Sequence, residues 1–186
     1  MIRVFVGIAL PEDLRLRLAG LCAGVPGAKW VAPENLHLTL RFIGEVEETL
    51  AEDVDAALAR IRAPAFALTF DRIDAFGSGR RPRVLWVGVE RNPALERLHD
   101  GVEAAVTRQG LDPESRKFMP HATLARLKGT KPARLGAYLS AYGGFRHGPV
   151  PVDRFTLFSS RLGKAGAIYR EEATYALEPA PAAGDG

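Results

Sequence analysis

The sequence predicts a duplicated fold of strands and helices, in which two similar lobes related by a pseudo-twofold axis face a shared cleft. The order strand, helix, histidine-bearing strand, helix, strand can be read twice along the 186 residues. The apolar run at residues 3–9 also matches residues 83–89, with apolar positions agreeing throughout. A short motif, His-x-Thr-Leu, then occurs once in each half.

The first half opens with a nearly apolar strand, which is typical of a central position in a sheet. A helix is expected from Pro11, with acidic residues in its first turn. The first histidine motif follows, and residues 45–62 have the apolar spacing of a second helix. Pro64 ends that helix, and residues 66–70 read as a strand.

The second half begins after residues 74–82, a loop rich in glycine and arginine and the best linker candidate in the chain. The remaining elements are expected in this order: strand 83–89, a helix after Pro93, the second histidine motif, helix 132–142, and strands 152–158 and 169–177. The predicted organisation is one bilobal domain over 1–178, with repeats at about 2–73 and 83–177, and it leaves open an exchange of terminal strands. Residues 179–186 are expected to be a flexible tail.

The composition is that of a globular protein, with 47% hydrophobic and 25% charged residues and a net charge of +3. No apolar run approaches the roughly 20 residues of a membrane span. Cys22 is the single cysteine, which excludes a disulfide framework and a thiolate metal site. We expect a cytoplasmic monomer. Most of the 25 basic residues are arginines, which suits phosphate ligands, although a GC-rich genome also favours arginine codons.

The two motifs carry the functional prediction. On a strand, a period of two places His37 and Thr39 on one face and Leu38 on the other. His121 and Thr123 share a face in the same way. Threonine is also a common strand residue, but its position after two of only four histidines favours a paired site. Two such strands across one cleft could act on one phosphate.

Two imidazoles on opposite sides of a phosphorus suit in-line displacement. With an ordinary pKa near 6.5, one takes a proton from the attacking water and the other gives a proton to the departing oxygen. The two threonine hydroxyls can donate to the non-bridging oxygens. This scheme needs no metal or other cofactor, and the sequence has no HExxH motif, no CxxC motif and no acidic cluster beside the histidines.

Neighbouring residues add candidates for substrate binding. Arg41 lies on the His37 face if its strand stays regular, whereas Arg126 needs a bulge or a strand end to reach the cleft. Strand-end solvation is the alternative for both arginines. Four aromatic residues near these strands either stack a nucleobase or pack in the core: Trp30, Phe42, Trp86 and Phe118. Core packing is the expected role of most of them, above all Trp86.

These motifs resemble the paired signatures of the two-histidine (2H) phosphoesterase superfamily. The surrounding words are similar to the RNA 2′,3′-cyclic phosphodiesterases, also called 2′-5′ RNA ligases (the ThpR/LigT family). The matching words are Arg3-Val4-Phe5-Val6, Trp30-Val31, Pro33 to Val46, and Pro120 to Arg126. The likeness covers residues 2–177, and Ala122 departs from the larger aliphatic residue common at its position.

The resemblance implies a bilobal α+β fold with mainly antiparallel sheets around a central cleft. It implies that His37 is the proton donor to the leaving 3′ oxygen and His121 the proton acceptor that activates water. Thr39 and Thr123 would hold phosphate oxygens, with Arg126 as a further phosphate ligand. The substrate would be RNA with a 2′,3′-cyclic phosphate end, tRNA fragments among them, and the product a 2′-phosphate.

Three alternatives remain open from the sequence. The same site can run in reverse and join RNA ends through a 2′-5′ linkage. The substrate can instead be a small cyclic nucleotide, in which case the basic segment 80–83 has no role. The third alternative is a nucleotide- or RNA-binding module without turnover, against which the presence of both histidines and both threonines argues.

Overall fold

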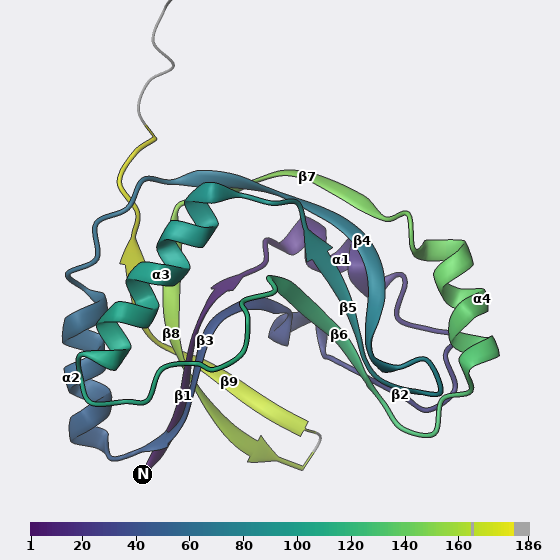
Figure 1. The fold of residues 1–186 in the computed structure, drawn as a ribbon, viewed down its shortest axis with the longest axis horizontal. Helices are drawn as coiled ribbons and strands as arrows, with labels where there is room; N and C mark the ends of the chain where they lie inside the picture. Colours follow the sequence, from purple (N-terminus) through teal and green to yellow (C-terminus); the bar gives the residue numbers. More distant parts are fainter. Residues whose placement is uncertain (165, 181–186) are drawn as a thin grey trace, which may run out of the picture.

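The computed structural model describes residues 1–164 and 166–180, which form one continuous, mainly antiparallel sheet with helices packed on it (Figure 1). The strands are β1 (Ile2–Ala9), β2 (Ala28–Trp30), β3 (His37–Val46), β4 (Phe66–Ser78), β5 (Arg81–Val89), β6 (His121–Leu127), β7 (Arg146–Val152), β8 (Arg154–Gly163) and β9 (Gly166–Ala176). The helices are α1 (Glu12–Ala19), α2 (Glu48–Leu58), α3 (Pro93–Thr107) and α4 (Pro132–Tyr142), with a 3-10 turn η1 (Pro33–Asn35). The predicted α+β class is therefore confirmed. Within the predicted tail, residues 181–186 lie outside the described part of the chain.

Each half of the chain gives one strand to the other lobe. In the first half β1 pairs with β3, but β4 crosses over and pairs with β5. In the second half β5 pairs with β6, and β8 crosses back to pair with β1. The sheet order β7-β4-β5-β6-β3-β1-β8-β9 is thus symmetric about the boundary between β6 and β3. The repeat boundaries inferred from the sequence stay a prediction, and neither repeat builds a lobe from its own strands alone.

The prediction of a linker at residues 74–82 is wrong, because this segment forms a β-hairpin. β4 continues through Ser78, and β5 begins at Arg81, whose amide donates to Ser78 Oγ at 3.0 Å. Gly77 has a φ of +118°, and a Cβ at this position would lie 2.6 Å from the Arg81 carbonyl oxygen. The glycines that suggested a flexible link therefore serve a tight turn. The single strand expected at 152–158 is likewise two strands, β7 and β8, which meet at Asp153.

The strand pairing relates the two halves with an offset of one residue from the match between residues 3–9 and 83–89. Gly7 pairs with Thr39 in β3, and Trp86 pairs with Thr123 in β6. Gly7 therefore corresponds to Trp86, whereas the apolar match placed it opposite Val87. Because side chains alternate along a strand, a shift of one residue exchanges the two faces of the sheet. Trp86 consequently lies on the face that carries the histidines and not in the core behind it.

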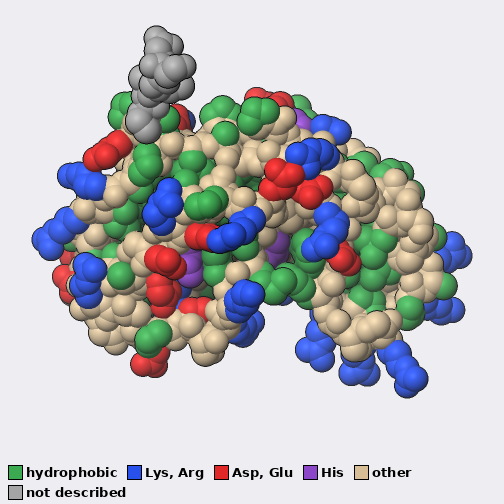
Figure 2. Space-filling model, turned by 45° about the horizontal axis from the view of Figure 1, so that its top comes forward, with side chains coloured by type: hydrophobic (Ala, Val, Ile, Leu, Met, Phe, Trp, Pro, Cys, Tyr) green, Lys and Arg blue, Asp and Glu red, His purple; other side chains and the backbone are tan. Residues whose placement is uncertain are grey.

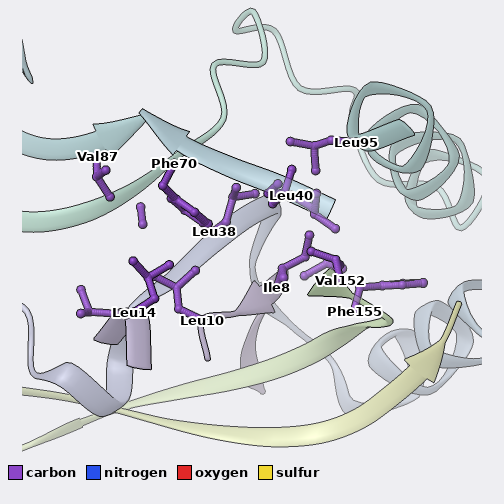
Figure 3. Close-up of a cluster of buried hydrophobic side chains, with 14 of the residues drawn as sticks. Ile8, Leu10, Leu14, Leu38, Leu40, Phe70, Val87, Leu95, Val152 and Phe155 are labelled. Atoms are coloured by element: carbon purple, nitrogen blue, oxygen red, sulfur yellow. The ribbon is translucent and has the colours of Figure 1, made fainter. Parts of the chain in front are cut away.

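A single hydrophobic core covers the other face of the sheet and extends across both lobes (Figure 3). Strand residues such as Leu38, Phe70 and Val87 point into it together with helix residues such as Leu14 and Leu95. α2 packs against α3, and Tyr138 of α4 donates to the Leu21 carbonyl oxygen after α1 at 2.9 Å. Throughout residues 1–164 and 166–180, every helix is too short or too polar to cross a bilayer.

Replacement of Leu38 by alanine should destabilise the protein by about 2–5 kcal/mol, because this fully buried side chain lies where β3 meets β6. Urea unfolding followed by circular dichroism would measure the loss in the free energy of unfolding. Leu162→Ala is the matched control, since the Leu162 side chain is 93% exposed and should contribute little. Equal stability losses in the two variants would contradict this account of the lobe boundary.

Candidate active site

The structure brings the four predicted motif side chains together at the boundary between the lobes. β3 and β6 are antiparallel neighbours, and their register pairs Leu38 with Ala122. This pairing places His37 beside Thr123, and Thr39 beside His121, all on the face opposite the core. The arrangement is therefore a square, with the two histidines on one diagonal and the two threonines on the other.

Both histidine rings are oriented by the same backbone contact. His37 Nδ1 lies 2.7 Å from the Asn35 carbonyl oxygen, and His121 Nδ1 lies 2.6 Å from the Met119 carbonyl oxygen. Since a carbonyl oxygen only accepts, each Nδ1 carries the hydrogen. In the neutral ring this leaves Nε2 as the atom that can take a proton, and in the charged ring as the atom that can give one.

Aromatic rings surround the side chain of His37. Its ring centroid lies 4.7 Å from that of Phe5, 5.3 Å from Tyr169 and 6.1 Å from Phe158. Burial lowers the pKa of His37 below its ordinary value; the bond to the Asn35 carbonyl opposes this shift, and the nearby His121 adds to it. His37 Nε2 is also 2.9 Å from Thr39 Oγ1. Burial thus shifts the His37 ring toward its neutral form.

His121 borders a larger and more open space. A cavity of about 440 Å³ lies beside it, lined among others by Arg72, Phe76, Trp86 and Phe118. The Phe76 ring meets the His121 ring edge-on at 4.9 Å, and the Trp86 ring lies at 6.1 Å. No hydrogen-bond partner of His121 Nε2 occurs in the part of the chain that the structure describes. This nitrogen is therefore free to meet a substrate or a water molecule.

A β-bulge follows the histidine motif in both β3 and β6. The two bulges determine on which face of the sheet Arg41 and Arg126 lie. Along β3 the register shifts between Val6 and Gly7, so that Leu40 is extra, and along β6 it shifts between Leu85 and Trp86, so that Leu124 is extra. Each extra residue reverses the alternation beyond it. The consequences for Arg41 and Arg126 are opposite.

Arg126 reaches the cleft face through the bulge. It pairs with Val84, which shares a face with Trp86, and its side chain is exposed. Its neighbour in β2 is Lys29, so two basic side chains stand side by side on the face that carries His121.

The expectation that Arg41 lies on the His37 face is wrong. The bulge turns it toward α3, where it is 8% exposed and its Nε lies 3.1 Å from Glu103 Oε2, an ion-pair distance without the angle of a hydrogen bond. Its Nη1 is 3.6 Å from Glu114 Oε2, and its Nη2 donates to the Asp112 carbonyl oxygen. Arg41 thus ties β3 to α3 and the segment after it, and we assign it no contact with a phosphate.

The sequence does not indicate the aromatic residues around His37, and it indicates only some of those around His121. Nothing in the local sequence marks Tyr169 or Phe158, because they come from the exchanged strand β8 and from β9. Two of the four aromatic candidates, Trp86 and Phe118, line the cavity. Trp30 is partly buried against the core. Phe42 is exposed, and the Arg3 guanidinium lies over its ring.

Among residues 1–164 and 166–180, no group of three or more His, Cys, Asp or Glu side chains gathers in a way that would hold a metal ion. Around the histidines in Figure 2 (purple), acidic and basic side chains mix on the visible face.

The chain was compared with known proteins. A model of the LigT like phosphoesterase family matches residues 8–86 and again residues 87–169. The RNA 2′,3′-cyclic phosphodiesterase of Aeropyrum pernix is 43% identical over 159 residues, covering 84% of this chain and 89% of the relative. That of Bacillus subtilis is 33% identical, covering 87% and 89%.

Solved structures are similar to this chain over nearly its whole length. E. coli LigT complexed with 3′-AMP superposes with a TM-score of 0.76 at 28% identity, covering 95% of this chain and 98% of that one. A Thermus thermophilus structure gives the same TM-score, identity and coverage. The family model matches each half of the chain once, as expected of a duplication, and together the two matches span most of its length. On this evidence the chain belongs to the LigT-like phosphoesterase family.

Proposed function

We propose that this protein hydrolyses terminal 2′,3′-cyclic phosphates of RNA to 2′-phosphomonoesters, with His37 and His121 as acid and base. The observation that carries the proposal is the square of side chains, in which each histidine presents Nε2 and has a threonine hydroxyl as its neighbour across the lobe boundary. Relatives that cover most of the chain are RNA 2′,3′-cyclic phosphodiesterases.

The reaction follows from the two Nε2 atoms. His121 Nε2 takes a proton from water as the water oxygen bonds to phosphorus. The bond from phosphorus to O3′ breaks in line, and His37 Nε2 gives its proton to O3′. Thr39 and Thr123 donate to the non-bridging oxygens, and Arg126 contributes positive charge from the same face. Every proton is accounted for by side chains of this chain, so the route needs no metal.

RNA suits the molecule better than a mononucleotide because basic side chains extend beyond the square. Arg80, Arg81 and Arg83 are exposed on the β4–β5 hairpin, and Lys29 and Arg126 are exposed on the neighbouring strands. In Figure 2 Lys and Arg side chains (blue) gather at the lower end of the right-hand lobe, which is where Figure 1 places this hairpin. Such a track can hold the phosphates of a longer chain. A cytoplasmic location and a monomeric state are part of the proposal.

Replacing His37 or His121 by alanine should each lower kcat for a cyclic-phosphate oligonucleotide by about 10²–10⁴-fold, because each variant lacks one proton transfer. Product analysis by mass spectrometry, with a chelator present, would measure this and identify the 2′-phosphate. A phosphodiester with a nitrophenol leaving group separates the two roles: this leaving group needs no proton, so His37→Ala should recover most of its activity and His121→Ala should not. Unimpaired hydrolysis in both variants, or rescue of His121→Ala instead, would contradict the assignment.

The pH dependence of kcat/KM should reflect the lowered pKa of His37, the proposed acid. His37 must be protonated to act, and burial lowers its pKa, so kcat/KM should fall as the pH rises through a value below about 6.5. Tyr169→Ala opens the ring to water and should move this alkaline limb upward. Tyr142→Ala, an exposed tyrosine on α4, is the matched control. An alkaline limb that does not move in Tyr169→Ala would count against His37 as the acid.

Removal of two charges from the hairpin tests the RNA preference. Arg80→Ala with Arg81→Ala should raise KM for an oligonucleotide several-fold more than KM for a cyclic mononucleotide, because only the longer substrate reaches the hairpin. The difference should shrink at high salt. Equal effects on the two substrates would favour a small cyclic nucleotide as the natural substrate. Tight binding of the RNA by the unmodified protein with no product would favour a binding module.

A further inference from the structure

The orientation of His121 depends on a long connection without helix or strand. Residues 108–120, here called the α3–β6 segment, run from the end of α3 across to the start of β6 (Figure 1). Near the end of this segment, the Met119 carbonyl oxygen accepts a hydrogen bond from His121 Nδ1 at 2.6 Å. A connection of this length adopts many conformations unless contacts fix it.

The carbonyl group that orients His37 has a different support. It belongs to Asn35 in the turn η1, and it accepts from His37 Nδ1 at 2.7 Å. The side-chain amide of Asn35 donates to the Ala167 carbonyl oxygen of β9 at 2.8 Å. A change in the α3–β6 segment should therefore reach His121 and leave the orientation of His37 as it is.

One face of α3 holds the α3–β6 segment at two places. Glu103 and His99 lie one turn apart on this helix, so their side chains are neighbours. Glu103 Oε1 accepts from the Glu114 amide at 2.8 Å. The His99 ring is stacked on the Phe118 ring, with centroids 3.9 Å apart and an interplanar angle of 8°. The segment is thus fixed in its middle and again directly before Met119.

Arg41 joins the first of these contacts to the strand that carries His37. Its Nη2 donates to the Asp112 carbonyl oxygen. Its Nη1 lies 3.6 Å from Glu114 Oε2, and its Nε lies 3.1 Å from Glu103 Oε2. The guanidinium is buried, and a buried charge that loses its partners is costly. Arg41 therefore fixes the α3–β6 segment relative to β3.

This anchor and His121 belong to different lobes. α3 packs against α2 and β3, and β3 pairs with β1 in the lobe of His37. β6 begins at His121 and pairs with β5 in the other lobe. The α3–β6 segment therefore links the base of one lobe to the strand that carries the acid. We propose that Arg41 is a positioning residue for His121, which acts through the anchored segment and the Met119 carbonyl oxygen.

The effect of Arg41 is on the tautomer and the direction of the His121 ring. While the Met119 carbonyl oxygen accepts from Nδ1, the neutral ring presents Nε2 without a hydrogen, and this is the form that takes a proton from water. When the segment moves, the hydrogen can occupy either nitrogen and the ring can turn, so fewer molecules have a base in place. This inference rests on the function proposed above, because it uses His121 as the base.

Two variants loosen the anchor and keep a cation beside Glu103. Arg41→Lys lacks the planar fork that also reaches Asp112 and Glu114, and Glu114→Ala removes a half-exposed partner. Each should lower kcat for a cyclic-phosphate oligonucleotide by about tenfold with little change in KM, because a misplaced catalytic group slows the chemical step. The double variant should lose no more than the weaker of the two single variants, since both remove one contact. Glu52→Ala, an exposed glutamate on α2, is the matched control and should leave kcat as it is.

NMR of the histidine ring nitrogens gives a signature that a purely structural role would not produce. At a pH of about 8 both rings are neutral, and two-bond correlations between ring protons and nitrogens distinguish the tautomers. The unmodified protein should carry the hydrogen on Nδ1 of both His37 and His121. In Arg41→Lys and in Glu114→Ala, His121 should change to a mixture of tautomers, whereas His37 should keep its own, because Asn35 lies outside the α3–β6 segment.

Three results would overturn the inference. The first is a kcat within about twofold of that of the unmodified protein in both variants. The second is a fall in kcat with the tautomer of His121 unchanged. The third is an equal change in both histidines, which would indicate a general loosening of the site. Hydrolysis of 2′,3′-cyclic AMP by the unmodified protein tests the proposed function separately. Its absence would overturn that function and the catalytic half of this inference, and the NMR comparison would still decide whether the anchor holds the His121 ring.

Discussion

The site depends on one antiparallel contact, the pairing of Leu38 with Ala122. It is the one register pair that joins β3 to β6 in the described part of the chain, whereas β3 pairs extensively with β1 and β6 with β5. Each lobe is therefore stabilised by its own ladder. Across the boundary, the lobes are joined by this pair and by the hydrophobic core that extends through both. Both are fully buried, so the geometry of the square rests on packing more than on backbone hydrogen bonds.

A period of two predicts correctly that each histidine shares a face with the threonine of its motif, because both bulges come after the threonines. Up to Thr39 and Thr123 the strands are regular, and simple alternation holds. Beyond them, an extra leucine in each strand reverses the faces, which removes Arg41 from the cleft and delivers Arg126 to it. Neither leucine is a residue that marks a bulge in a sequence, so the irregularity is set by the pairing with β1 and β5 and not by local propensity.

The duplication was visible in the sequence, but its consequence for the sheet was not. Local patterns show which segments are strands, whereas the exchange of β4 and β8 is a choice of partner between strands far apart in the chain. The same limit explains Trp86. Its apolar neighbours fit either face of a buried strand, and only the register with Thr123 shows that it supports His121. The sequence does not distinguish the hairpin at Gly77 from a linker, because glycine is common in tight turns and in flexible linkers alike.

Two nearly identical motifs acquire different properties from what surrounds them. Gly7 lets the chain pass close to His37, since a Cβ there would lie 2.8 Å from the Leu38 carbonyl oxygen, and Phe5 and Tyr169 then shield the ring from water. Trp86 occupies the corresponding place under His121, beside an open pocket. An imidazole with a lowered pKa is a stronger acid once charged, and an anionic phosphate bound next to it favours the charged form. In the proposed mechanism, a phosphate bound beside His37 favours the charged form of this ring, and the buried aromatic surroundings favour transfer of its proton to O3′.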